Sequence, residues 1–286
     1  MMTNYHCHSH YCDGTLGLED YIVAAINKGM QAIGFSGHSP VPFASVWNMP
    51  ALRLNDYLSE IDTLRQKYAP RISVLKSLEV DFIDGIMGPY SQWVRDAKLD
   101  YVIGSVHYTR PMPDGTPWSI DDHLGVFLEG VRLVYDNDIK SAVMHYFDLQ
   151  RRMIVDQTPD IIGHLDKIKM HNRHRPLFDE SATWYRDELR HLLQCVADKG
   201  TIVEINTKSF CGNGLLFPGE DLFDWLRELK IPVVINSDSH HPNHLTDGFE
   251  HVAALLLKHH IHEVACVMPH SRNFISIHDW LNHSTL

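Results

Sequence analysis

The feature that most constrains the fold of this chain is a recurring pattern, a short apolar segment that ends at a histidine or an acid. The pattern begins at residues 5–8, where His6 and His8 flank Cys7. Alternate side chains of a strand point to the same side, so these two imidazoles can grip one metal ion. One such pair is weak evidence in a chain with 21 histidines. The pattern returns, however, at residues 33–38, 74–79, 102–107, 161–164 and 233–240. This repetition favours metal binding, which explains why histidines and acids recur at the ends of apolar segments.

Strand-like and helix-like segments alternate along the chain. We expect strands at residues 5–8, 31–36, 72–79, 101–106, 160–163, 201–205 and 232–237. We expect helices at residues 17–29, 55–68, 88–98, 122–137, 139–155, 181–199, 221–229 and 247–258, followed by one more short strand and helix. Near-continuous apolar strands that alternate with helices predict a parallel sheet covered by helices.

Seven such strands with ligands at their C-terminal ends favour an α/β fold with a closed or nearly closed (β/α)7 barrel. In such barrels the site lies at that end and is built from the loops that follow the strands. An open doubly wound sheet is the alternative. The chain shows no internal repeat and no linker, so we expect a single domain that spans residues 1–286.

The composition narrows the classes of function. Hydrophobic residues make up 44% and charged residues 21% of the chain, as in ordinary globular proteins. The formal net charge of −11 argues against binding nucleic acid or a membrane surface through bulk charge. Five scattered cysteines indicate reduced thiols and a cytoplasmic location. We see no signal peptide and no apolar run of the ~20 residues that a membrane span needs.

The motifs together resemble the PHP (polymerase and histidinol phosphatase) family over essentially the whole chain. The similarity is clearest at residues 5–9, 36–40, 78–82, 104–108, 160–166 and 236–240. The segments Leu-Glu-Val-Asp-Phe at 78–82 and Ile-Gly-His-Leu-Asp at 162–166 look like the monofunctional histidinol-phosphatase branch. The resemblance implies a distorted seven-stranded barrel, in agreement with the strand count above.

The resemblance also implies two or three divalent transition-metal ions, with zinc, manganese or iron favoured by mixed nitrogen and oxygen ligands. The first ion would be held by His6, His8, Glu79 and Asp238. The second would share Glu79 and add His107 and His164. The third would be held by Asp13, His38 and His240. The family often has histidine where this chain has Asp13, and His10 is a rival for that place.

The chemistry expected of such a centre is phosphomonoester hydrolysis. Neighbouring metal ions clamp the phosphoryl oxygens, ionise a bridging water that attacks phosphorus, and stabilise the leaving oxygen. No protein nucleophile is needed. The excess positive charge of the ions would hold a phosphate dianion although the whole chain is acidic.

Candidate substrate-binding residues lie on loops at the same end of the strands. They are Arg173, Arg175, Lys208, Trp118 and Asp166. The family often carries an arginine in the loop after the sixth strand, which this chain lacks at residues 207–210. For a substrate with an ammonium group and an imidazole, the further candidates are Asp114, Asp121, Phe43, Trp47 and Tyr108.

The sequence therefore predicts a metal-dependent phosphomonoesterase that acts on a small molecule, most simply histidinol phosphate in histidine biosynthesis. A PHP phosphoesterase for nucleotides or short oligonucleotides is the first alternative. A metal-binding regulatory protein without catalysis is the second. The sequence does not indicate an oligomeric state.

Overall fold

The computed structural model describes residues 1–173, 175–269 and 271–282. Its core consists of two parallel sheets. The first contains β1 (Thr3–Asn4), β2 (Ala32–Phe35) and β3 (Ser73–Lys76) in that order. The second contains β4 (Glu79–Asp81), β5 (Ile103–Ser105), β6 (Ile161–Ile162), β7 (Ile202–Asn206) and β8 (Val233–Asn236). The predicted α/β class with parallel strands is confirmed.

Isolated bridges connect the ends of the two sheets. Cys7 pairs with Ser239 beyond β8, and His38 pairs with Glu79 at the start of β4. The backbone N–H of His8 donates to the carbonyl of Ser239 at 2.9 Å. Both bridges involve site residues or their neighbours, so the sheets meet where the metal ligands were predicted.

Three strand predictions need correction. The expected strand 72–79 is two strands, because the chain changes partners after Lys76: β3 pairs with β2, and β4 pairs with β5. The expected strand 5–8 is not formed: β1 ends at Asn4, and beyond it Cys7 makes only an isolated bridge with Ser239. The tail has two strands instead of one, an antiparallel hairpin of β9 (Glu263–Met268) and β10 (Ser271–Ser276).

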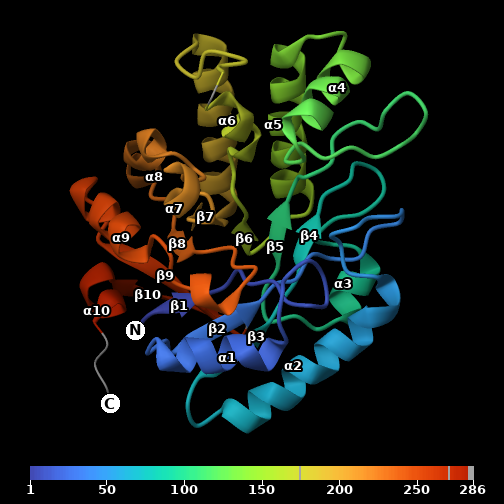
Figure 1. Ribbon diagram of the computed structural model, residues 1–286. Helices are drawn as coiled ribbons and strands as arrows, with labels where there is room; N and C mark the ends of the chain where they lie inside the picture. Colours follow the sequence, from blue (N-terminus) through green and yellow to red (C-terminus); the bar gives the residue numbers. More distant parts are fainter. Residues whose placement is uncertain (174, 270, 283–286) are drawn as a thin grey trace.

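Helices surround the strands (Figure 1). The α-helices are α1 (Leu18–Asn27), α2 (Leu54–Tyr68), α3 (Gln92–Asp96), α4 (Leu124–Val134), α5 (Ile139–Asp156), α6 (Thr183–Lys199), α7 (Phe210–Asn213), α8 (Phe223–Glu228), α9 (Phe249–Lys258) and α10 (Ile277–Leu281). The 3-10 helices are η1 (Ala51–Arg53), η2 (Lys167–Asn172), η3 (Glu220–Leu222) and η4 (Pro242–His244). The predicted helices are present, most of them with shorter ends, although α2 and α5 are each one residue longer than predicted; η2 lies where no helix was predicted. Among the described residues, no helix has the length and apolar character to cross a membrane.

A small buried cluster lies between the strands and supports the site from below. It is formed by Tyr5, Leu75, Tyr101, Ile103, Ile161, Ile202, Val234, Ala265 and Val267. The Tyr101 hydroxyl donates to the carbonyl of Tyr5. Because this cluster lies one or a few residues before most of the predicted ligands, it holds the strand ends in place.

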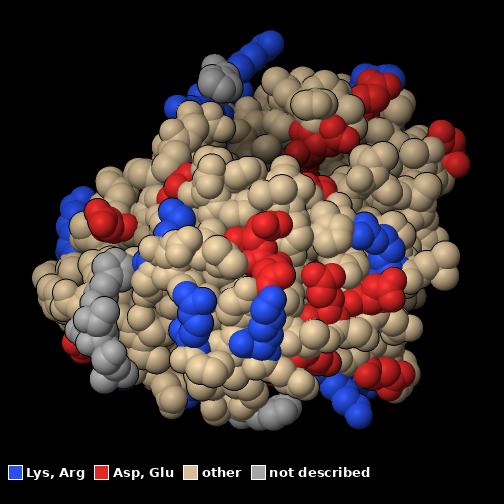
Figure 2. Space-filling model, turned by 60° about the horizontal axis from the view of Figure 1, so that its bottom comes forward, with Lys and Arg blue, Asp and Glu red and all other residues tan. Residues whose placement is uncertain are grey.

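The surface charge is mixed on the face shown in Figure 2, where acidic and basic side chains are interspersed. Some surface charges of the molecule pair locally, as in the contact of Lys67 with Glu19 at the ends of α2 and α1. That face therefore shows no continuous basic surface among the described residues.

Candidate metal centre

The predicted ligands lie together because most of them come directly after a parallel strand. His38, His107 and His164 follow β2, β5 and β6, and Glu79 opens β4. Two ligands have backbones in the left-handed region, His164 with φ of 22° and Asp238 with φ of 47°. Such conformations cost free energy in residues other than glycine. They turn the chain sharply where these strands end.

Glu79 lies at the centre, with one carboxylate oxygen toward each of two ligand groups. On one side, Glu79 Oε2 is 3.2 Å from His6 Nε2 and 3.6 Å from His8 Nε2. Asp238 Oδ1 completes this group at 3.1 Å from His8 Nε2 and 3.7 Å from His6 Nε2. The structure thus brings together the residues predicted for the first ion.

The other oxygen of Glu79 faces the second group. Glu79 Oε1 is 2.8 Å from His164 Nε2 and 3.5 Å from His107 Nε2. The two Nε2 atoms are 3.2 Å apart. All three side chains are buried, so their close approach is not screened by solvent.

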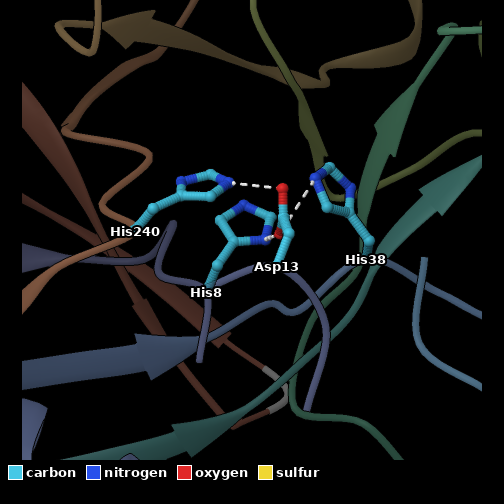
Figure 3. A group of neighbouring side chains, drawn as sticks. All are labelled: His8, Asp13, His38 and His240. Atoms are coloured by element: carbon cyan, nitrogen blue, oxygen red, sulfur yellow. Dashed lines mark hydrogen bonds and ion pairs between the residues drawn. The ribbon is translucent and has the colours of Figure 1, made fainter. Parts of the chain in front are cut away.

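The third group is more open and is shown in Figure 3. Asp13 lies between the rings of the other members, with Oδ2 3.1 Å from His240 Nε2 and Oδ1 3.8 Å from His38 Nε2. His8 Nδ1 also lies 3.7 Å from Asp13 Oδ1, so His8 borders both this group and the first. His10 is exposed and its ring packs against Tyr11, outside the group. The geometry favours Asp13 over His10.

A second layer orients several of the imidazoles. His6 Nδ1 is 2.6 Å from Glu204 Oε1, and His107 Nδ1 is 2.8 Å from Asp81 Oδ1. Carboxylates accept hydrogen bonds, so the Nδ1 atoms donate and the Nε2 atoms face the centre. Neither Glu204 nor Asp81 was predicted from the sequence as a positioning residue. The available signal was Glu204 itself, because an acid inside an otherwise apolar strand indicates a specific partner.

The charges of the centre support one another. Burial would raise the pKa of Glu79, but the histidines around it outweigh burial and hold the pKa well below its usual value. Burial would lower the pKa of His107, but Asp81 and Glu79 raise it to about 9. Burial and the nearby Lys167 lower the pKa of His164 to about 4. The acids are therefore ionised and His164 is neutral, which are the forms that bind metals, whereas His107 would lose a proton when a metal binds.

The donor set fits divalent transition metals. His6 Nε2, His8 Nε2, His38 Nδ1 and Glu79 Oε2 are buried and lie close to other ligand atoms without forming a well-aligned hydrogen bond. Buried polar atoms of this kind are costly unless they are satisfied. In addition, the Lys208 ammonium lies 3.3 Å from Asp238 Oδ1 and 3.2 Å from His240 Nε2. A cation thus lies against two ligand atoms, and mixed nitrogen and oxygen donors suit zinc, manganese or iron.

A pocket of about 460 Å³ opens beside the third group. Its wall is formed by Asp13, His38, Val46, Trp47, Ser119, Asp121, Asp122, His123, Leu124, Lys167, Met170, His171 and Lys208. Of the five residues first predicted to bind substrate, Arg173, Arg175, Lys208, Trp118 and Asp166, only Lys208 lies in this wall. Arg173 and Arg175 are exposed and are not part of it.

Two predicted substrate contacts have other surroundings. Trp118 is 3% exposed, donates from Nε1 to the carbonyl of Arg110, and packs against Phe127 of α4. It is neither a lid nor a surface aromatic, because its ring fills a space against that helix. Asp166 is buried and accepts from Lys169 and from the backbone of Gly219.

The residues predicted to contact the ammonium and imidazole groups of the substrate lie partly in the pocket wall and partly outside it. Trp47 lies in the wall and stacks on Tyr108, with ring centroids 5.2 Å apart. Asp121 is also in the wall, where it pairs with Lys167. Asp114 is exposed and accepts from the backbone of Thr116.

Comparison with known proteins identifies the family of this chain. A family model described as the PHP domain matches residues 4–208. The chain therefore belongs to the PHP domain family, as the motifs predicted.

The relatives within this family carry a narrower name. The probable histidinol-phosphatase of Deinococcus radiodurans is 28% identical over 254 residues, which cover 87% of this chain and 90% of the relative. The histidinol-phosphatase of Bacillus subtilis is 25% identical and covers 86% of this chain and 96% of the relative. A DNA polymerase/3'-5' exonuclease of Bacillus subtilis matches only 38% of this chain and 19% of its own length, at 32% identity.

A solved structure supports the fold. The histidinol phosphate phosphatase of Lactococcus lactis, crystallised with zinc, L-histidinol and phosphate, aligns with a TM-score of 0.75 at 21% identity. The alignment covers 95% of this chain and 98% of that protein. This likeness shows that the two chains share a fold.

Proposed function

We propose that this protein is a histidinol-phosphatase, a phosphomonoesterase that hydrolyses L-histidinol phosphate to L-histidinol and phosphate in histidine biosynthesis. The observation that carries the proposal is the centre built around Glu79, with a ligand group on each carboxylate oxygen and a third group at the mouth of a pocket. The curated relatives named histidinol-phosphatase, which align along most of the chain, support the same substrate.

The proposed centre holds two or three divalent ions. His6, His8, Glu79 and Asp238 would hold the first, and Glu79, His107 and His164 the second. Asp13, His38 and His240 would hold the third. Bound metal ions would supply Lewis acidity and a water ionised at neutral pH.

Side chains of the protein would orient the metal ligands and bind the substrate phosphate. Glu204 and Asp81 hold the Nδ1 atoms of His6 and His107, which directs their Nε2 atoms toward the proposed metal positions. Lys208 lies against the ligand atoms at the pocket mouth, and its ammonium would turn to the substrate phosphate when a metal takes its place. It would thus supply the cation that an arginine supplies elsewhere in the family.

The walls of the pocket would provide selectivity. Trp47 lines the pocket and would present an aromatic surface to the imidazole of the substrate. Asp122 is an exposed acid in the same wall and suits the ammonium group, since Asp121 is already paired. A charge pair and an aromatic contact are each worth about 1–3 kcal/mol.

At the level of the whole chain, we propose a single domain over residues 1–286 with a distorted seven-stranded barrel. The bridges Cys7–Ser239 and His38–Glu79 support closure between the two sheets. The five cysteines, all free of disulfides, support a cytoplasmic location. The net charge of −11 supports a small-molecule substrate over nucleic acid.

The test of function is a comparison of substrates with one metal at a fixed concentration. Histidinol phosphate should exceed p-nitrophenyl phosphate by about 100-fold or more in kcat/KM, given the two contacts above. Equal values for these substrates and a nucleoside monophosphate would leave a general phosphatase. Preference for the nucleotide or for a short oligonucleotide would support the first alternative, and no hydrolysis in metal-loaded protein would support a regulatory protein.

The third ion is tested by a matched pair of variants. Asp13→Ala should lower kcat strongly and reduce metal content by one ion, while His10→Ala should change neither, because His10 lies outside the group. Metal analysis together with kcat distinguishes the two. The reverse ranking would transfer the ligand role to His10.

A further inference from the structure

A buried ion pair in the pocket wall has no part in the three ligand groups. Lys167 Nζ lies 2.8 Å from Asp121 Oδ2, and the two side chains are 11% and 21% exposed. Asp121 also accepts from the hydroxyl of Ser119, which fixes the carboxylate. Both members of the pair line the pocket beside Asp13 and His38.

The pocket has few cations for an anionic substrate. Among the described residues of its wall, Lys167 and Lys208 are the only lysines or arginines, while Asp13, Asp121 and Asp122 are acids. Lys208 is 40% exposed at the mouth, where it contacts ligand atoms. Lys167 is the buried cation, and a charge-assisted hydrogen bond is stronger where solvent is excluded.

Lys167 keeps its charge in this position. Burial would lower the pKa of Lys167, but the carboxylates of Asp121, Asp238 and Glu79 outweigh burial and raise it. The backbone N–H of Lys167 donates to the carbonyl of His164 at 2.9 Å, so the residue lies beside a predicted metal ligand. An ammonium has three N–H donors, and the contact with Asp121 uses one side of it.

We propose that Lys167 is a phosphate-binding residue of this site and that Asp121 is its positioning residue. The ammonium would donate to a phosphoryl oxygen from the buried wall of the pocket, while Lys208 approaches from the mouth. The inference deepens the proposed function, because it rests on this pocket receiving a phosphoryl group.

The chain offers a matched control on the same short helix. Lys169, two residues further along η2, is also buried and also pairs with an acid, Asp166. It does not line the pocket. Lys169→Met and Lys167→Met therefore each leave a carboxylate without its lysine, but only Lys167→Met removes a cation from the pocket.

The experiment measures the affinity of zinc-loaded protein for inorganic phosphate by calorimetry, with metal content determined in parallel. Lys167→Met should weaken phosphate binding about tenfold or more at unchanged metal content. Lys167→Arg should retain most of the affinity, and Lys169→Met should retain it fully, whatever its effect on thermal stability. Wild-type affinity in Lys167→Met, or equal weakening in Lys169→Met, would overturn the inference.

A variant that keeps the lysine covers the case in which Lys167→Met does not fold. Asp121→Asn leaves the ammonium but removes the carboxylate that positions it, so phosphate affinity should fall by a smaller factor with the metals still bound. Unchanged affinity in Asp121→Asn would then overturn the inference. Because phosphate is the probe, the result is independent of whether histidinol phosphate is the substrate, which the substrate comparison decides separately.

Discussion

Glu204 offers the sharpest test of the second layer, through the substitution Glu204→Gln. Its Oε1 is 2.6 Å from His6 Nδ1 and 3.0 Å from Asn236 Nδ2. Its Oε2 accepts from the backbone of His164 at 2.9 Å and from Asn206 Nδ2 at 2.9 Å. Burial would raise the pKa of Glu204, but His6 outweighs burial and lowers it, so the side chain is an ionised acceptor on both oxygens.

Glutamine cannot reproduce this arrangement in either orientation. If its amino group replaces Oε1, it faces His6 Nδ1, and the imidazole must move its proton to Nε2, the atom that faces Glu79. If the amino group replaces Oε2, it opposes the N–H of His164 and the amide of Asn206. We therefore expect metal affinity to fall by about 10–100-fold, the range for lost second-layer partners, which equals about 1.4–2.7 kcal/mol.

The measurement is a metal titration against a chelator of known affinity. Glu228→Gln is the control, because Glu228 is a half-exposed acid of α8 paired with Arg190 on the surface. It should leave metal affinity unchanged. Wild-type metal affinity in a folded Glu204→Gln protein would refute the argument that this carboxylate sets the tautomer of His6.

Two further predictions concern packing and thiol reactivity. A Cβ at Gly130 would lie 2.4 Å from the Trp118 ring, whereas Gly125 on the same helix has open space. Gly130→Ala should therefore lower the free energy of unfolding by about 1–3 kcal/mol, and Gly125→Ala should leave it unchanged or raise it by up to about 1 kcal/mol; urea unfolding checks both, and equal effects would contradict the packing of Trp118. Burial raises the pKa of Cys12 to about 12, so alkylation there at pH 8 should be far slower than at the exposed Cys211 and should speed up toward pH 11. Peptide mass mapping measures both rates, and modification of Cys12 as fast as that of Cys211 at pH 8 would contradict the prediction.

The ligands could be recognised from the sequence because the geometry of parallel strands determines where most of them lie. A residue that ends a buried parallel strand must lie at one end of the sheet, so His38, His107 and His164 need no further information to be grouped. The split between β3 and β4 was not predictable in this way, because Ser77 and Leu78 are buried like the strand residues around them. Which neighbour each half pairs with depends on the whole sheet. Glu79 nevertheless lies beside the other ligands, at the junction between β3 and β4.

The substrate side of the pocket was harder to predict because loop residues have no such periodic constraint. Arg173 and Lys167 were both basic residues of one predicted loop, yet only Lys167 lies in the pocket wall. The difference arises from η2, whose first residue faces Asp121 from a loop more than forty positions earlier. Sequence spacing contains no signal for that contact, since a lysine in an irregular loop is usually solvated. A loop cation can be assigned to a phosphate site only once the carboxylate that holds it there is known, and for this reason the Lys167–Asp121 pair requires the structure.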